Sequence, residues 1–136
     1  MVKLSVVIPC YNEEENLLLI LRKFNDIIKR PDIEVILVDN GSTDKSQKVL
    51  KEELPKFTFA RTVKVEENQG YGHGILMGLK EARGDFLGWT HADLQTDPKD
   101  VIKALEKIED CGNDPSVYIK GKRKGRPAFD EFFTKG

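Results

Sequence analysis

The sequence predicts an α/β domain with three layers, in which helices cover both faces of a mainly parallel β-sheet. Short runs of apolar, often β-branched residues alternate along the chain with segments whose apolar residues recur every three or four positions. The connections between the apolar runs are too long for hairpins, so successive strands are expected to run parallel, with helices as crossovers.

The chain opens with a strand and a helix. Leu4–Ile8 is a short β-branched run that Pro9 stops, which is typical of a buried strand. The apolar residues within Leu17–Ile28 follow in steps of three and one, which places them on one face of a helix. We expect this helix to begin at Asn12 or Glu13, because these residue types start helices.

A second strand and helix follow. Glu34–Val38 is an apolar run that ends in turn-forming residues, as a buried strand would. The next helix is expected to begin near Thr43 or Asp44 and to end at Pro55, since proline cannot continue a helix. Thr62–Val65 predicts a third, weaker strand.

The remaining chain continues the alternation. A helix is expected to open after a glycine cluster and to carry Ile75 and Leu79 on one face. Asp85–Trp89 is predicted to be the fourth strand. Pro98 suits the first turn of a further helix, and Val117–Ile119 predicts a fifth short strand.

Composition limits the classes of protein that the chain can belong to. Its 136 residues fit one domain. Twenty-two basic and 23 acidic residues give a net charge of −1, which offers no global field for nucleic acid or an anionic membrane. A mean hydropathy of −0.44 argues against an integral membrane protein. Cys10 and Cys111 form no C-x-x-C pair and no metal-ligand spacing, which favours a reduced, cytoplasmic protein.

Polar residues gather where four of the predicted strands end. The carboxyl ends of strands are the edge at which open parallel sheets bind ligands. The four polar segments are Pro9–Glu13, Asp39–Asp44, Glu66–Gly74 and Thr90–Gln95. They supply an aromatic ring, carboxylates, amides and backbone N–H groups. This set suits a nucleotide with a metal-bridged diphosphate, with Tyr11 stacked on the base.

Each of these segments also has a structural interpretation. Asp39–Asp44 is typical of a turn followed by a helix cap. The glycines at 70, 72, 74 and 78 would let a helix approach the sheet closely. The basic run Lys120–Arg126 is either a solvated surface or a clamp for phosphate. The common position of the polar segments at strand ends favours the functional interpretation.

Other phosphate-binding motifs do not fit the sequence. Gly70–Gly74 lacks the G-x-G-x-x-G spacing and follows the third predicted strand instead of the first, which argues against a dinucleotide site. The sequence contains no P-loop motif, and no serine elbow or Cys–His pairing for acyl transfer is visible.

Four motifs in a fixed order carry a resemblance to a known family. They are Pro-Cys-Tyr-Asn-Glu at 9–13, Val-Asp-Asn-Gly-Ser-Thr-Asp at 38–44, Asn-Gln-Gly-Tyr-Gly at 68–72 and Ala-Asp-Leu-Gln-Thr-Asp-Pro at 92–98. The chain resembles the family 2 glycosyltransferases over nearly its whole length, in particular the dolichol-phosphate mannosyltransferase-like branch. The resemblance implies a Rossmann-like GT-A fold, with residues 1–136 as one nucleotide-sugar-binding domain that uses a divalent cation.

The resemblance also implies roles for individual residues. Asp39 would recognise the base, and Asp93 matches the second acid of the family's D-x-D element, which holds Mn²⁺ or Mg²⁺ on the donor diphosphate. The residues expected to bind a UDP- or GDP-sugar are Pro9, Tyr11, Glu13, Asp39, Asn68, Gly70, Ala92 and Arg123. The residues expected to hold the metal are Asp93, His91 and Gln95.

Two features depart from the family pattern. His91 stands at the position of the first D-x-D acid. Imidazole is a softer ligand, so the site is expected either to prefer Mn²⁺ or to leave His91 out of the metal shell. The chain also ends at Gly136, before the acceptor-binding half of longer relatives. It is therefore expected to be truncated, and no general base is assigned.

The predicted function is transfer of a sugar from a nucleotide diphosphate to an acceptor such as polyprenyl phosphate or a saccharide. The alternative is a non-catalytic or split nucleotide-sugar-binding module, with the acceptor half supplied by a second copy or a partner chain. We expect a cytoplasmic protein and leave open a peripheral position at the membrane face. Phe129, Phe132 and Phe133 suggest an apolar tail that needs cover.

Overall fold

A computed structural model of the chain describes residues 1–92, 97–113 and 132–135, and these include one five-stranded sheet of order β3-β2-β1-β4-β5. Its strands are β1 (Leu4–Cys10), β2 (Ile33–Asn40), β3 (Ala60–Val65), β4 (Phe86–Trp89) and β5 (Phe132–Lys135). β1 pairs in parallel with β2 and β4, and β2 pairs in parallel with β3. β5 is antiparallel to β4. The prediction of a mainly parallel sheet is confirmed.

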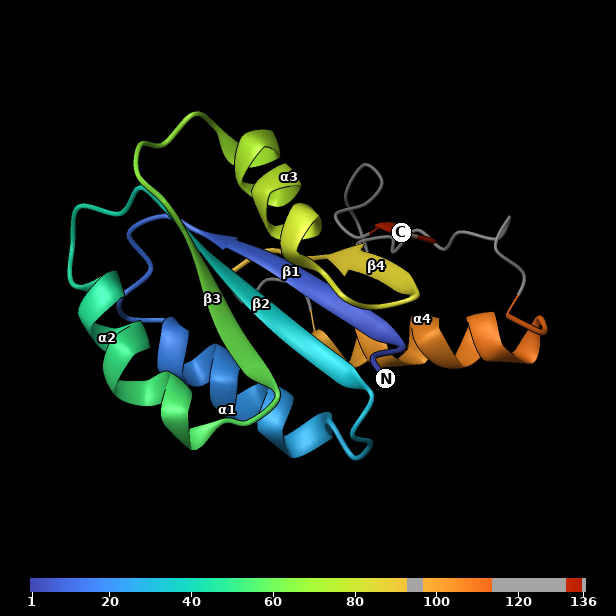
Figure 1. Cartoon of the computed structure of the whole chain (residues 1–136). Helices are drawn as coiled ribbons and strands as arrows, with labels where there is room; N and C mark the ends of the chain where they lie inside the picture. Colours follow the sequence, from blue (N-terminus) through green and yellow to red (C-terminus); the bar gives the residue numbers. More distant parts are fainter. Residues whose placement is uncertain (93–96, 114–131, 136) are drawn as a thin grey trace, which may run out of the picture.

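Helices cover both faces of this sheet, as predicted. They are α1 (Leu17–Ile27), α2 (Ser46–Glu53), the 3₁₀ turn η1 (Leu54–Lys56), α3 (Tyr71–Glu81) and α4 (Pro98–Asp110). Figure 1 shows α3 on one face and α1, α2 and α4 on the other. None of the helices in the described ranges combines the length and apolar character needed to cross a bilayer.

Two apolar cores separate the three layers. Side chains alternate along a strand, so Val6 and Ile8 of β1 join the core beneath α1 and α4, whereas Val7 joins the core beneath α3. All residues of β1 and β2 are buried. Such continuous burial is expected of central strands in a sheet with both faces covered.

Helix α3 packs unusually close to the sheet, and its glycines allow this. A Cβ on Gly78 would lie 2.4 Å from Val7 Cγ1 and 2.7 Å from Val38 Cγ2, and one on Gly74 would lie 2.8 Å from Asn40 Nδ2. The structural interpretation of these two glycines is therefore confirmed. The prediction that the helix opens after the glycine cluster is wrong, because α3 begins at Tyr71 and contains both glycines.

Other element boundaries also differ from prediction, and α2 begins at Ser46 instead of near Thr43 or Asp44. β1 runs through Pro9 to Cys10. The Val7 carbonyl accepts a hydrogen bond from the Thr90 N–H at 3.1 Å, so Val7 faces β4. Pro9, two residues later, faces the same neighbour. Because β4 ends at Trp89, the N–H that proline lacks has no ladder partner there to lose. Helix α1 starts at Leu17 instead of at residues 12 or 13.

Several predictions for the late part of the chain fall on residues that the structure does not describe. The predicted strand Val117–Ile119, the basic run Lys120–Arg126 and Phe129 lie outside the described residues. β5, which contains Phe132 and Phe133, was not predicted as a strand. It extends the sheet beyond β4.

The amino ends of the strands carry paired charges. The Arg30 guanidinium contacts Asp32 at 2.6 Å and Glu109 at 2.7 Å, and these contacts lower the pKa of both acids. The Arg61 Nε lies 2.9 Å from the buried Glu34 carboxylate. Arg30, Arg61 and Glu34 line a hollow of about 590 Å³. Because these charges pair with one another or with neighbouring acids, they serve the fold.

Candidate functional site

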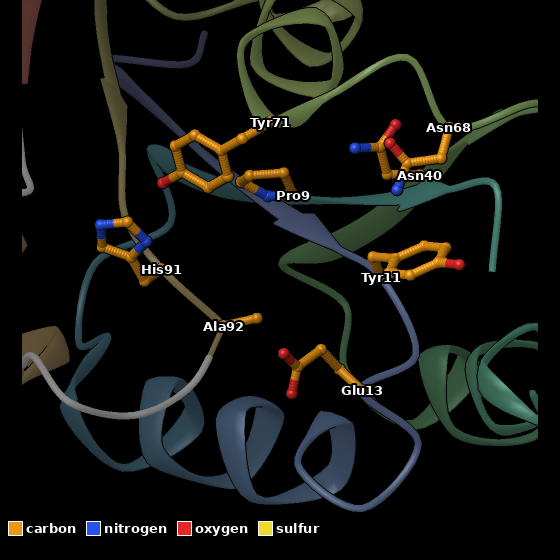
Figure 2. Close-up of a pocket in the computed structure, with 8 residues that line it drawn as sticks. All are labelled: Pro9, Tyr11, Glu13, Asn40, Asn68, Tyr71, His91 and Ala92. Carbon is orange, nitrogen blue, oxygen red and sulfur yellow. The ribbon is translucent and has the colours of Figure 1, made fainter.

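A pocket of about 220 Å³ opens at the other edge of the sheet, where β1, β2 and β4 end. Its lining residues are Pro9, Tyr11, Glu13, Asn40, Asn68, Tyr71, His91 and Ala92 (Figure 2). All four polar segments that the sequence placed at strand ends contribute to this wall. Tyr11 and Tyr71 are 46% and 43% exposed, so both rings present apolar area to solvent.

Asn12 ties the loop after β1 to the loop after β2. Its Oδ1 accepts hydrogen bonds from the backbone N–H of Thr43 at 2.8 Å and of Asp44 at 3.2 Å, and its own N–H donates to Ser42 Oγ at 3.1 Å. Asn12 has a left-handed φ of 52°, a conformation that asparagine tolerates better than most residues. This loop role explains why α1 cannot begin at Asn12, and it fixes the neighbouring Tyr11 relative to β2.

Asp44 strengthens the same junction. Its carboxylate accepts from the N–H of Ser46 at 2.8 Å and of Glu14 at 3.3 Å. Burial raises the pKa of Asp44, but these hydrogen bonds outweigh it, and the net effect lowers the pKa. Because Ser46 opens α2, the end of the Asp39–Asp44 segment does stabilise a helix start, as the structural interpretation proposed. That interpretation does not account for Asp39.

Asp39 is buried beside the pocket, and one of its carboxylate oxygens has no partner in the part of the chain that the structure describes. It is 2% exposed, and its Oδ1 accepts from the Ser42 N–H at 3.1 Å. Its Oδ2 is buried and has no hydrogen bond among the described residues. Asp39 does not line the pocket itself, but its Cα pairs with Cys10, which lies between the lining residues Pro9 and Tyr11. A buried acceptor without a donor is costly, so a ligand N–H would satisfy it.

The thiol of Cys10 reports the same buried environment. Burial raises the pKa of Cys10, and the negative charges of Glu13 and Asp39 raise it further. The thiol is therefore neutral at physiological pH and unsuited to nucleophilic chemistry. Cys10 and Asp39 are paired in register, so their side chains share one face of the sheet.

Asn40 was not among the predicted site residues, although it lines the pocket. It follows Asp39 in β2, so its side chain points to the opposite face, toward α3. The Asn40 Nδ2 donates to the Gly70 carbonyl at 3.1 Å, and Gly70 is not itself a lining residue of the pocket. The buried Oδ1 of Asn40 has no partner among the described residues. Period-two alternation places this side chain on the face opposite Asp39, so the sequence carried no signal that it shares the pocket.

Gly41 brings Asn68 to the pocket. It has a φ of +72°, and a Cβ there would lie 2.4 Å from the Asn68 nitrogen. Only glycine allows the two loops to approach this closely. The Asn68 Oδ1 accepts from the Gly70 N–H at 2.8 Å, which shapes the turn that leads into α3.

An aromatic pair closes one end of the pocket. The rings of Tyr71 and His91 stack with their centroids 5.0 Å apart and an interplanar angle of 17°. His91 was predicted as a metal-site residue, whereas Tyr71 was not predicted. Sequence reasoning could have found Tyr71 only by the aromatic ring at the start of a helix, a weak signal.

The predicted metal site is only partly described. Asp93 and Gln95, together with the predicted sugar-nucleotide contact Arg123, lie outside the described residues. Within residues 1–92, 97–113 and 132–135, no three His, Cys, Asp or Glu side chains gather as a metal site.

Comparison with known proteins identifies the fold and the sequence relationship. A family model described as glycosyl transferase family 2 matches residues 5–131. The chain is 30% identical to a dolichol-phosphate mannosyltransferase of Pyrococcus furiosus, over 98% of this chain and 39% of that protein. It is 37% identical to an undecaprenyl-phosphate 4-deoxy-4-formamido-L-arabinose transferase of Proteus mirabilis, over 98% of this chain and 40% of that protein. The chain thus spans about two-fifths of the length of these curated relatives.

Solved structures with the same fold also exceed this chain in length. A mannosyltransferase of Pyrobaculum calidifontis, PcManGT, solved with GDP-Man and Mn²⁺, superposes with a TM-score of 0.81 at 20% identity, over 98% of this chain and 44% of its own. The TarS 1–349 structure of S. aureus with UDP-GlcNAc gives a TM-score of 0.73 at 26% identity, over 93% of this chain and 36% of its own. These likenesses confirm the predicted GT-A fold.

Proposed function

The chain belongs to glycosyl transferase family 2, and from that premise we propose that residues 1–136 form one domain that binds a nucleotide-diphosphate sugar with a divalent cation. The sugar would then be transferred to an acceptor such as polyprenyl phosphate. The curated relatives are named as transferases that use dolichol phosphate or undecaprenyl phosphate, which supports this acceptor class. Their names do not favour the alternative of a non-catalytic module.

The observation that carries the proposal is the buried Oδ2 of Asp39, which has no partner among the described residues. A carboxylate oxygen accepts a hydrogen bond from the ring N–H of uracil or guanine, whereas adenine and cytosine have no such N–H when attached to ribose. Asp39 therefore favours a UDP- or GDP-linked donor. Tyr11, two residues from the lining residue Pro9 and half-exposed in the pocket, would stack on the base.

The remaining donor contacts are proposed by position. Besides Tyr11 and Asp39, the residues assigned to the nucleotide sugar are Pro9, Glu13, Asn68, Gly70, Ala92 and Arg123. Four of these line the described pocket. Gly70 contributes through its carbonyl, which holds Asn40 in place.

The cation is assigned to Asp93, with His91 and Gln95 as further ligands. When bound, a divalent ion would neutralise negative charge on the diphosphate leaving group. The chemistry of the donor set suits Mn²⁺ better than Mg²⁺, because imidazole is a softer ligand than carboxylate. The protein's own part is to hold the base end through Asp39 and to orient the diphosphate end beside His91.

Titration calorimetry with UDP- and GDP-sugars, with and without Mn²⁺, tests this proposal, followed by an assay of transfer to polyprenyl phosphate. The Asp93→Ala variant should lose the metal dependence of binding, and His91→Asp should improve the response to Mg²⁺. Asp26→Ala, which removes an exposed acid near the far end of α1, is the matched control and should change neither. The proposal fails if no nucleotide binds. Metal-dependent binding without transfer by this chain or by a longer form would support the module instead.

A further inference from the structure

We propose that Tyr71 is a further donor-binding residue, whose ring packs against the sugar of the nucleotide sugar. This inference rests on the proposed function, because that function sets the direction in which the donor lies. It assigns a specific contact to the sugar moiety, which the sequence analysis did not assign to any single residue.

Tyr71 is exposed to solvent within the pocket. The side chain is 43% exposed although it lines the pocket wall. Aromatic rings in a concave polar site bury a large apolar area when a ligand covers them. The stack on His91, at 5.0 Å and 17°, fixes the plane of the ring in advance.

Tyr71 also lies at the end of the pocket that is opposite the proposed base site. Figure 2 shows Tyr11 and Tyr71 at different ends of the pocket, with Pro9 between them in this view and His91 beside Tyr71. Tyr11 and Asp39 define the base end in the proposed function, and His91 begins the segment that carries Asp93. A nucleotide sugar is a linear molecule of base, ribose, diphosphate and sugar. The groups at the Tyr71 end are therefore the diphosphate and the sugar.

The chemistry of a phenol ring decides between these two groups. A tyrosine ring presents a face of negative partial charge, which does not attract a diphosphate. Only the hydroxyl would donate to a phosphate oxygen, and the Tyr71→Phe variant removes that hydroxyl while it keeps the ring. The C–H groups on one side of a pyranose ring carry positive partial charge and are apolar enough to pack on such a face. Tyr71 thus suits the sugar.

The backbone that carries Tyr71 is held firmly in place. Tyr71 is the first residue of α3, and the preceding Gly70 carbonyl accepts from Asn40 Nδ2 at 3.1 Å. Helix α3 is seated on β1 and β2 through the close contacts at Gly74 and Gly78. A side chain that is held before the ligand arrives loses little conformational freedom on binding.

The test compares affinities for the nucleotide with and without its sugar. The dissociation constants of UDP, UDP-glucose, GDP and GDP-mannose are measured with Mn²⁺ for the unchanged protein and for Tyr71→Ala, Tyr71→Phe and Leu76→Ala. Leu76 lies on the same helix, is 58% exposed and does not line the pocket, so it controls for changes to α3. We expect Tyr71→Ala to weaken the nucleotide sugar about fivefold, as for loss of one aromatic contact. The bare nucleotide should change less than twofold. Tyr71→Phe and Leu76→Ala should retain the difference.

Three outcomes overturn the inference. Equal weakening of nucleotide and nucleotide sugar by Tyr71→Ala would assign the ring to the nucleotide, and unchanged affinities would assign it no contact. Equal affinity of the unchanged protein for both ligands would leave no sugar contact to explain. Absence of all nucleotide binding would instead sink the proposed function. If circular dichroism shows that Tyr71→Ala does not fold, Tyr71→Gln replaces it, because glutamine is a good helix former without a ring.

Discussion

Asp39 of β2 lies opposite Cys10 of β1, and both side chains are buried where the two strands end. The Asp39 carboxylate uses one oxygen to accept from the Ser42 N–H, while the other has no partner among the described residues. An acid in this state costs stability, and proteins keep such costs mainly where a ligand relieves them.

Asp39→Asn should separate stability from binding. The amide keeps an oxygen for the Ser42 N–H, and an unpaired buried amide costs less than an unpaired carboxylate. We therefore expect the melting temperature to stay unchanged or to rise. Affinity for UDP or GDP should fall about tenfold or more, because a hydrogen bond to a charged group is worth roughly 1.5–3 kcal/mol. Calorimetry and thermal melts measure both effects, with the exposed Asp26→Asn as control. A lower melting temperature with unchanged affinity would make Asp39 a structural residue.

The two cysteines should differ sharply in reactivity. Cys10 is fully buried and burial raises its pKa, whereas Cys111 is exposed. Because the thiolate is the reactive form, a thiol reagent at pH 8 should label one site quickly in the native protein and both sites in denaturant. Mass spectrometry of the labelled protein counts the sites, and Cys111→Ser should leave almost no fast labelling. Rapid labelling of Cys10 in that variant would contradict the buried strand end.

Gly41→Ala should cost more than an equivalent change elsewhere. The new Cβ would adopt an unfavourable φ of +72° and would lie 2.4 Å from the Asn68 nitrogen. We expect a loss of about 2 kcal/mol or more in unfolding free energy, together with weaker nucleotide binding. Gly112→Ala is the matched control: its φ of +77° is similar, but nothing lies within 4 Å of the added Cβ. That control should cost about 1 kcal/mol. Equal costs in urea melts would show that the two loops do not touch.

Glu34 should make stability depend on acid pH. It is 7% exposed and accepts hydrogen bonds from Ser5 Oγ at 2.5 Å, Arg61 Nε at 2.9 Å and the Arg83 N–H at 2.8 Å. Burial raises the pKa of Glu34, but the hydrogen bonds from Arg61 and Ser5 outweigh it and lower the pKa. A lowered pKa stabilises the fold above the ordinary value of 4.5, and this stabilisation is lost as pH falls below that value.

The test of the Glu34 prediction is a set of urea melts between pH 7 and pH 3. Glu34→Gln should lose about 2 kcal/mol at pH 7, because Arg61 is left without its ion pair. The difference from the unchanged protein should shrink toward pH 3. Glu52→Gln, at an exposed position on α2, should follow the unchanged protein. A constant difference across this pH range would mean that the Glu34 charge contributes nothing.

The parts of the fold that depend on periodicity were predictable from the sequence. The steps of three and one between Leu17 and Phe24 correspond to the buried face of α1, and the apolar run Glu34–Val38 corresponds to the buried β2. These patterns follow from burial alone, which a single sequence records. The exact ends of elements depend on contacts between distant residues. Asn12 is hydrogen-bonded to the loop after β2, and no local helix propensity reveals this contact between distant residues.

Site residues that follow a strand in the sequence were predictable, whereas residues that reach the pocket through the packing of a helix on the sheet were missed. Tyr11 comes directly after β1 and His91 lies two residues beyond β4, so the topology of a parallel sheet brings them to one pocket. Asn40 and Tyr71 reach the same pocket because α3 is seated closely on the sheet, and that contact is visible only in three dimensions.

In the proposed complex, Asp39 and Tyr11 hold the base of a nucleotide sugar, and the segment beginning at His91 holds its diphosphate end. A crystal structure of the protein with Mn²⁺ and the tighter of UDP-glucose or GDP-mannose tests it most directly. We expect the ring N–H of the base on Asp39 Oδ2, the base stacked on Tyr11, and the metal on Asp93. A base bound away from Asp39, or a nucleotide seated at the amino ends of the strands beside Arg61, would contradict it.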